Sequence, residues 1–181
     1  MSSEQEILEL GGLTLAHAFL ILTKLEPDEL LCPFAVVEGE EGREILEFPA
    51  DTQEIAVENG KRYLETPEYG ISRIAFARDG RCLTESLEYI DAISVSLRNI
   101  KSDYETTFSQ FYQFTDHGLT FLGDIEFMLG SEADNPEQAR IHKSLIDAGI
   151  ATHPTAAELV TELQANRLPL PPLLEQSGML Q

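Results

Sequence analysis

Asp116 and His117 are the residues of this sequence best suited to acid–base chemistry. They are adjacent, in an Asp-His-Gly segment typical of a turn between strands. An aspartate that orients an imidazole on a loop can hold a general base. The same pair also suits a turn through local hydrogen bonding alone. Asp116 and His117 are therefore the catalytic candidates, with both interpretations left open.

The other histidines are His17, His142 and His153, which lie far apart in the sequence. His17 is inside an apolar segment, which favours a hydrogen-bonded core histidine over a ligand. His142 and His153 flank a predicted helix in the C-terminal part, and we expect both to be exposed. None of the three is predicted to be catalytic.

Glu38, Glu40 and Glu41 cluster at the apex of a predicted hairpin. Their oxygens would suit calcium, but calcium takes six to eight oxygen ligands and three carboxylates supply too few. The sequence also has no phosphate loop, dinucleotide fingerprint, zinc pattern or G-x-S-x-G elbow. We therefore predict no metal and no cofactor, and we lean against an enzyme, although residues distant in sequence could still meet.

The charge balance bears on the choice of partner. The 181 residues contain 32 Asp and Glu against 12 Lys and Arg, a formal net charge of −20. Residues 1–68 alone hold 16 acidic and 4 basic side chains. Such a surface repels the phosphates of nucleic acids and anionic lipid headgroups. We expect neither nucleic acid nor a membrane as a partner.

The N-terminus bears on location. It begins Met-Ser-Ser-Glu-Gln-Glu, acidic where a secretory signal is basic. The apolar run at 13–22 falls short of the roughly 20 residues that cross a bilayer, so it predicts a core helix. Cys32 and Cys82 are too few for a disulfide scaffold. We expect a cytoplasmic protein with reduced thiols.

Residue patterns predict the elements that would position these groups. Apolar spacing, capping residues and period-two alternation indicate helices and strands. The predicted helices are 13–25, 52–65, 137–148 and one from 154; the strands are 32–37, 43–48, 71–78, 89–97, 104–114 and 119–122. Turns are predicted at 79–81 and 116–118, and Gly149 is expected to end a helix in the left-handed conformation. The aromatic residues at 104–114 fit a sheet core, because almost no basic residue accompanies them.

Four segments carry a resemblance to a known family: residues 33–38, 51–56, 74–80 and 90–93. With these segments the chain resembles small bacterial α+β proteins of unknown function, in which a hairpin, a helix and a meander of strands follow one another. The resemblance covers about residues 13–130. It implies a fold and a bacterial origin, and no activity or site residues.

The predicted architecture is α+β, with an antiparallel sheet of about five or six strands and helices on one face. Residues 1–130 form the α+β domain, and residues 131–181 form a helical extension with a Leu/Pro-rich C-terminal arm. The arm is expected to cross its own domain, to cross a neighbouring subunit, or to be disordered.

Three functions fit these observations. The first is a non-catalytic cytoplasmic protein that acts through contacts with an unidentified protein partner and by self-association into a homo-oligomer. The second is a small-molecule-binding protein or enzyme with a pocket on the sheet face. The third is an acidic mimic of nucleic acid that binds a basic protein.

Overall fold

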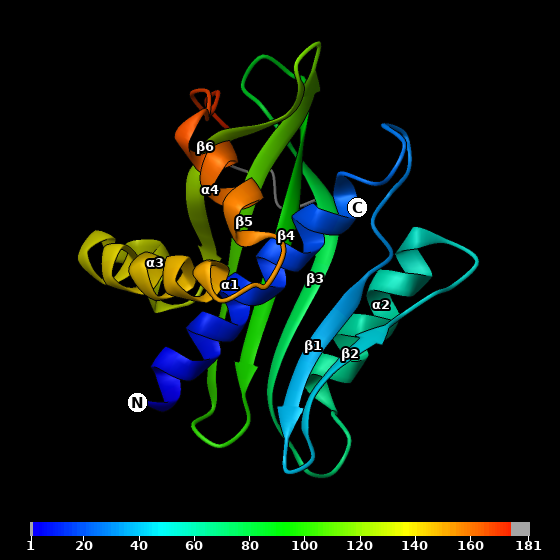
Figure 1. Cartoon of the computed structure of the whole chain (residues 1–181), viewed down its shortest axis with the longest axis vertical. Helices are drawn as coiled ribbons and strands as arrows, with labels where there is room; N and C mark the ends of the chain where they lie inside the picture. Colours follow the sequence, from blue (N-terminus) through cyan, green and yellow to red (C-terminus); the bar gives the residue numbers. More distant parts are fainter. Residues whose placement is uncertain (1, 175–181) are drawn as a thin grey trace.

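The computed structural model describes residues 2–174, which form six antiparallel strands, four α-helices and a short 3₁₀ helix (Figure 1). The elements are α1 (Ser3–Leu22), β1 (Phe34–Gly39), β2 (Gly42–Glu47), α2 (Gln53–Glu65), β3 (Ile71–Leu83), β4 (Tyr89–Asn99), β5 (Tyr104–Thr115), β6 (Gly118–Leu129), η1 (Ser131–Asp134), α3 (Pro136–Ala151) and α4 (Ala157–Ala165). The strand order is β2-β1-β3-β4-β5-β6. The predicted α+β class, with an antiparallel sheet and C-terminal helices, is confirmed.

The two faces of the sheet have different covers. Because successive residues of a strand point to opposite faces, Ala75 and Ala77 of β3 share one face, and Ile74 and Phe76 share the other. The first face is buried under α1, α3 and α4, which lie in front of the sheet in Figure 1. We call it the helical face. The second face, called here the far face, is covered by α2 at the β1 and β3 end, so the prediction of helices on one face holds for α1, α3 and α4 but not for α2.

α1 begins ten residues before the predicted helix. The side chain of Ser2 caps it by accepting a hydrogen bond from the backbone N–H of Gln5, at 3.1 Å. Helices from the C-terminal part pack on its outer side and the sheet on its inner side, so α1 is buried around most of its circumference. It has the length and hydropathy of a membrane-spanning helix, but 61% of its most apolar window is buried inside the protein, as in a core helix.

α1 and α3 touch through their backbones. A Cβ atom added to Gly12 would lie 1.9 Å from the carbonyl oxygen of Ile146, and one added to Gly149 would lie 1.9 Å from that of Glu9. The prediction that Gly149 ends a helix is therefore wrong. α3 continues to Ala151, and Gly149 is needed because no side chain fits between the two helices.

The turn predicted at residues 79–81 is also wrong, because β3 runs straight through it. Gly80 pairs with Ala92 and Arg81 pairs with Asp91 in a regular antiparallel ladder with β4. The Asp-Gly pair favours a turn through local conformational preference alone. Eleven residue pairs with β4 outweigh that preference and keep the segment extended. This extension of β3 creates the pocket described below.

The C-terminal arm, at residues 168–174, crosses the far face of its own sheet. The backbone N–H of Leu168 donates to the carbonyl oxygen of Phe121 in β6, and that of Glu85 donates to the carbonyl oxygen of Pro172. Between these two attachments, Leu170 and Leu173 pack on a small apolar cluster. That cluster consists of Cys82, Ala92, Phe111 and Leu122. Of the three expectations for the arm, packing on its own domain describes these residues; the remainder of the predicted arm, 175–181, lies outside the described part of the chain.

We predict that replacing Leu170 and Leu173 together by Asp makes the Cys82 thiol reactive. Cys82 is fully buried beneath the arm, and carboxylates cannot remain in that apolar cluster. Thiol titration of the native protein in a Cys32→Ser background measures the effect, with Leu87→Asp, at a leucine that is 71% exposed, as the control. Equal protection of Cys82 in both variants would contradict the arm's covering role.

Candidate binding pocket

A pocket of about 240 Å³ lies beside the last part of β3, beyond the first residue of β1. β1 pairs with β3 only as far as Phe34 opposite Ala77, whereas β3 runs on to Leu83. The space beside the last part of β3 is therefore left to the loop before β1 and to the start of α2. The lining residues are Leu30, Gln53, Asp79, Gly80, Arg81 and Asp91.

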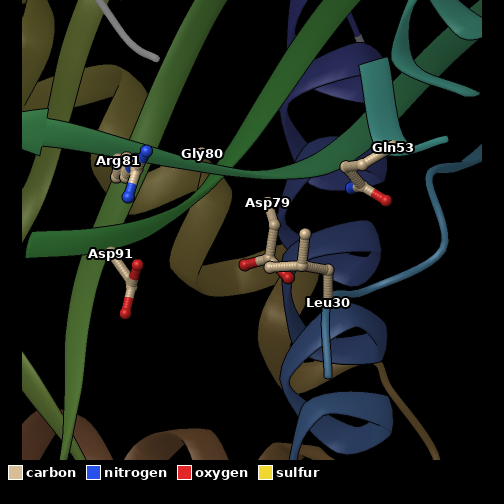
Figure 2. Close-up of a pocket in the computed structure, with 6 residues that line it drawn as sticks. All are labelled: Leu30, Gln53, Asp79, Gly80, Arg81 and Asp91. Carbon is tan, nitrogen blue, oxygen red and sulfur yellow. The ribbon is translucent and has the colours of Figure 1, made fainter. Parts of the chain in front are cut away.

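Leu31 fixes the loop wall of this pocket. Its backbone N–H donates to the carboxylate of Asp79 at 2.6 Å, and its carbonyl oxygen accepts from Nε2 of Gln53 at 3.1 Å. Its side chain is fully buried in the core. Since both polar groups and the side chain of Leu31 are held, the neighbouring Leu30 is positioned at the pocket. Figure 2 shows Leu30 beside Asp79, with Gln53 on one side and Arg81 and Asp91 on the other.

Asp79 is the most unusual side chain of the pocket, because it is a carboxylate with only 4% exposure. One oxygen accepts from Leu31 and the other accepts from the Tyr112 hydroxyl at 2.7 Å. Burial raises the pKa of Asp79, while these two hydrogen bonds partly oppose the rise. Burial, followed by the negative charge of Asp79, raises the pKa of Tyr112 as well. No cation forms an ion pair with Asp79 within the described residues.

Arg81 and Asp91 form the outer side of the pocket. They face each other across β3 and β4 on the helical face. The guanidinium of Arg81 stacks over the Tyr89 ring at 4.4 Å, which fixes its direction. Partial burial raises the pKa of Asp91, and the charge of Arg81 opposes that rise. When all groups are ionised, the two carboxylates and one guanidinium give the pocket a net charge of −1.

Asp116 and His117 lie away from this pocket, in the turn between β5 and β6. Both are exposed. The backbone N–H of His117 donates to the hydroxyl of Thr115 at 3.2 Å, which is the local bonding expected of a turn. The structure does not bring either residue to the pocket lining, and their catalytic role stays a prediction.

His142 belongs to a second polar site, near the start of α1. It is 5% exposed, so the predicted exposure is wrong. Its Nδ1 lies 2.5 Å from the carboxylate of Glu132, and its Nε2 lies 2.6 Å from that of Glu4. Tyr104 and Thr106 also donate their hydroxyls to Glu132. Burial tends to raise the pKa of Glu132, but its hydrogen bonds outweigh burial and lower it.

His153 is 8% exposed, so its predicted exposure is also wrong. Its Nδ1 accepts from the backbone N–H groups of Thr155 and Ala156, before α4. Its Nε2 therefore carries the hydrogen and donates to Nδ1 of His17 at 3.2 Å. The predicted hydrogen bonding of His17 is confirmed, but its side chain is only partly buried. Burial lowers the pKa of both imidazoles, which fits their neutral, structural pairing.

Sequence reasoning missed Asp79, Arg81 and Asp91 because the first two were assigned to a turn. The available signal was the period-two alternation of residues 71–78 and of residues 89–97, on either side of the Asp-Gly pair. An uninterrupted strand would have placed Asp79 among core residues of the helical face. The contribution of Leu31 and Gln53 had no sequence signal, since both come from distant segments.

The fold and the pocket together define an α+β protein with an open antiparallel sheet and a small acidic pocket at the end of its third strand. Comparison with protein-family models, with curated proteins and with solved structures found no match to this chain.

Proposed function

We propose that this protein is a non-catalytic cytoplasmic binding protein whose pocket takes a small organic cation, such as an amine or a guanidine. The observation that carries the proposal is the buried carboxylate of Asp79, which lines the pocket with no ion-pair partner within residues 2–174. A buried carboxylate is stabilised by an opposite charge close to it. The protein's net charge of −20 also concentrates cations at its surface.

The shape of the site supports binding by a preformed pocket. The two hydrogen bonds of Leu31, to Asp79 and Gln53, fix the loop that lines one side of the pocket. The stacking of Arg81 on Tyr89 fixes the outer side. A ligand would therefore lose little affinity to ordering of the site. The six lining residues include no serine, cysteine or histidine, and we assign the two carboxylates of the lining to binding a cation.

We predict that Asp79→Asn and Asp91→Asn each weaken the binding of agmatine or putrescine by at least roughly tenfold, since a charged hydrogen bond is lost in each. Isothermal titration calorimetry at pH 7 measures the affinity, with butyrate as an anionic probe that we expect not to bind. Because burial raises the pKa of Asp79, the affinity should fall as the pH falls toward that pKa and the carboxyl group becomes neutral.

Asp116→Asn is the matched control. It removes the same charge from an exposed turn outside the pocket lining, so the affinity should not change. Equal weakening by Asp116→Asn and Asp91→Asn would indicate unspecific attraction to an acidic surface. Absence of binding by either cation would also contradict the proposal.

An acidic mimic of nucleic acid is a second candidate function. The ion pairs at the β1–β2 hairpin decide which glutamates can be substituted to test it. Glu38 is paired with both Arg43 and Arg73, at 2.6 and 2.7 Å, so its substitution would also disturb the sheet. Glu40 and Glu41 are exposed at the apex. Replacing these two by Gln removes two charges without breaking an ion pair of the sheet. If the variant still bound basic proteins as well as the wild type does in a pull-down, the mimic candidate would be rejected.

A further inference from the structure

β2 forms one edge of the sheet and is exposed along its length. In the strand order it has β1 on one side, and no described strand lies on the other. Only Leu46 of its six residues is partly buried, and Ile45 is 50% exposed. An edge strand of this kind presents unpaired backbone groups that can pair with another strand.

The hydrogen bonding of the hairpin shows which groups are free. The backbone N–H of Phe48 donates to the carbonyl oxygen of Pro33 at 2.9 Å, so residue 48 points toward the β1 side. Bonding direction alternates along an antiparallel strand. Residues 42, 44 and 46 therefore bond to β1, whereas Arg43, Ile45 and Glu47 direct their N–H and C=O groups outward.

We propose that two copies of this chain associate through antiparallel pairing of β2 with β2, with Ile45 on the two-fold axis. This register places Arg43 opposite Glu47 of the second copy and, by symmetry, Glu47 opposite the second Arg43. All outward backbone groups of residues 43, 45 and 47 are then paired. The result is one continuous sheet of twelve strands, formed through an isologous contact.

Charge selects this register over its neighbours. A shift that puts Glu44 on the axis places Glu44 opposite Glu44 of the second copy and Glu41 opposite Glu47 of the second copy. Both pairs repel. A shift that puts Leu46 on the axis places Arg43 opposite Pro49, which has neither a charge nor an N–H to donate. Only the register centred on Ile45 pairs both charged outward residues with opposite charges.

The intramolecular contacts of β2 are compatible with this pairing. Arg43 contacts Glu38 through Nε and Nη2, which leaves Nη1 to reach a second carboxylate. Antiparallel pairing also puts the two hairpin apices, with Glu40 and Glu41, at opposite ends of the interface. The net charge of −20 on each copy opposes association, so the contact forms in salt of about 0.15 M, where charges are screened beyond about 8 Å.

A charge-swap experiment tests the register directly. Sedimentation equilibrium at 0.15 M salt and tens of micromolar protein should show the wild type shifting from its 20.1 kDa monomer toward twice that mass. Arg43→Glu sets like charges opposite each other in a dimer, and so does Glu47→Arg. Each variant alone should associate at least roughly tenfold more weakly. When the two variants are mixed, every substituted position faces an opposite charge, and the dimer mass should return.

Arg140→Glu is the control, because it makes the same charge change at an exposed residue of α3, outside β2, and should leave association unchanged. Circular dichroism establishes that each variant is folded. A monomeric wild type would overturn the proposal. So would a dimer that persists in Arg43→Glu, or a mixture of the two swapped variants that stays monomeric. These outcomes are independent of ligand binding, since neither residue lines the pocket.

Discussion

Replacing Gly149 by Ala is expected to lower the free energy of unfolding by about 3 kcal/mol or more. In an uncrowded helix the same change stabilises, because glycine costs about 1 kcal/mol relative to alanine. Here the added methyl group would meet the carbonyl oxygen of Glu9 at 1.9 Å and its carbonyl carbon at 2.6 Å. These are backbone atoms, so α1 and α3 must separate along a contact that is buried on both sides.

The neighbouring glycines of α1 supply the matched pair. A methyl group on Gly12 would meet the backbone of Ile146, whereas one on Gly11 would meet side-chain atoms of Leu97 and Phe108 at 2.9 to 3.0 Å. Side chains can shift by a few tenths of an ångström more easily than a helix can. Urea denaturation should therefore show a much larger loss for Gly12→Ala than for Gly11→Ala. Equal losses would mean that the backbone contact does not control stability.

The double variant Gly12→Ala with Gly149→Ala should lose less than the sum of the single losses. One separation of the two helices relieves both clashes, so the second substitution adds little. Strict additivity would contradict a shared contact.

Local signals predicted those parts of the fold that local chemistry controls. α2 begins after Thr52, whose hydroxyl accepts from the backbone N–H of Ile55, and it ends at Glu65 as expected. The aromatic residues of β5 were assigned to the sheet core, and Phe108, Phe111 and Tyr112 are buried there. In each case the decisive contact or the decisive periodicity lies within a few residues of sequence.

Errors arose where a distant segment decides the outcome. Gly149 is a good helix terminator in isolation, but its role is set by Glu9, 140 positions earlier. His142 lies on a helix with a polar sequence, yet it is buried because Glu132 and Glu4 meet it from two other elements. No periodicity within α3 carries that information.

The candidate site was unpredictable for the same reason. The pocket depends on β1 beginning only at Phe34, opposite Ala77, while β3 continues to Leu83, and that difference in length is a property of the pairing register. The carboxylate of Asp79 then meets Leu31 and Tyr112, which are 48 and 33 positions away. Composition alone indicated an acidic protein, whereas the fold locates one acidic side chain that is buried and lacks an ion-pair partner within the described residues.

Glu132→Gln should lower the free energy of unfolding at pH 7 by about 3 kcal/mol, because the buried network loses its central negative charge. The Glu132 side chain has no solvent exposure, and it accepts from His142, Tyr104 and Thr106. The amide of Gln keeps the shape of the carboxylate but replaces one acceptor oxygen by a donor. The amide N–H can face the Thr106 hydroxyl, which then donates to the carbonyl oxygen of Leu129. The hydrogen bonds from His142 and Tyr104, however, lose their charge assistance.

The pH dependence of stability distinguishes the charge of Glu132 from its packing. Its pKa in the folded protein lies below the ordinary value of 4.5, so it contributes stability that is fully present above pH 4.5. That contribution is lost as the pH falls through the folded pKa and Glu132 becomes protonated. The stability difference between wild type and Glu132→Gln should therefore be largest near neutral pH and should shrink in acid. Urea denaturation at pH 7, 5 and 3.5 measures it.

Glu137→Gln provides the control, because it is the same substitution at a fully exposed position, where Glu137 pairs with Arg140 on the helix surface. Its free energy of unfolding should match that of the wild type at every pH. If the Glu132 variant matched the wild type at pH 7, the network would be dispensable for attaching α3 to the sheet. If the difference in free energy of unfolding between wild type and Glu132→Gln stayed constant with pH, the effect would come from packing, because a contribution from the charge of Glu132 disappears when Glu132 is protonated.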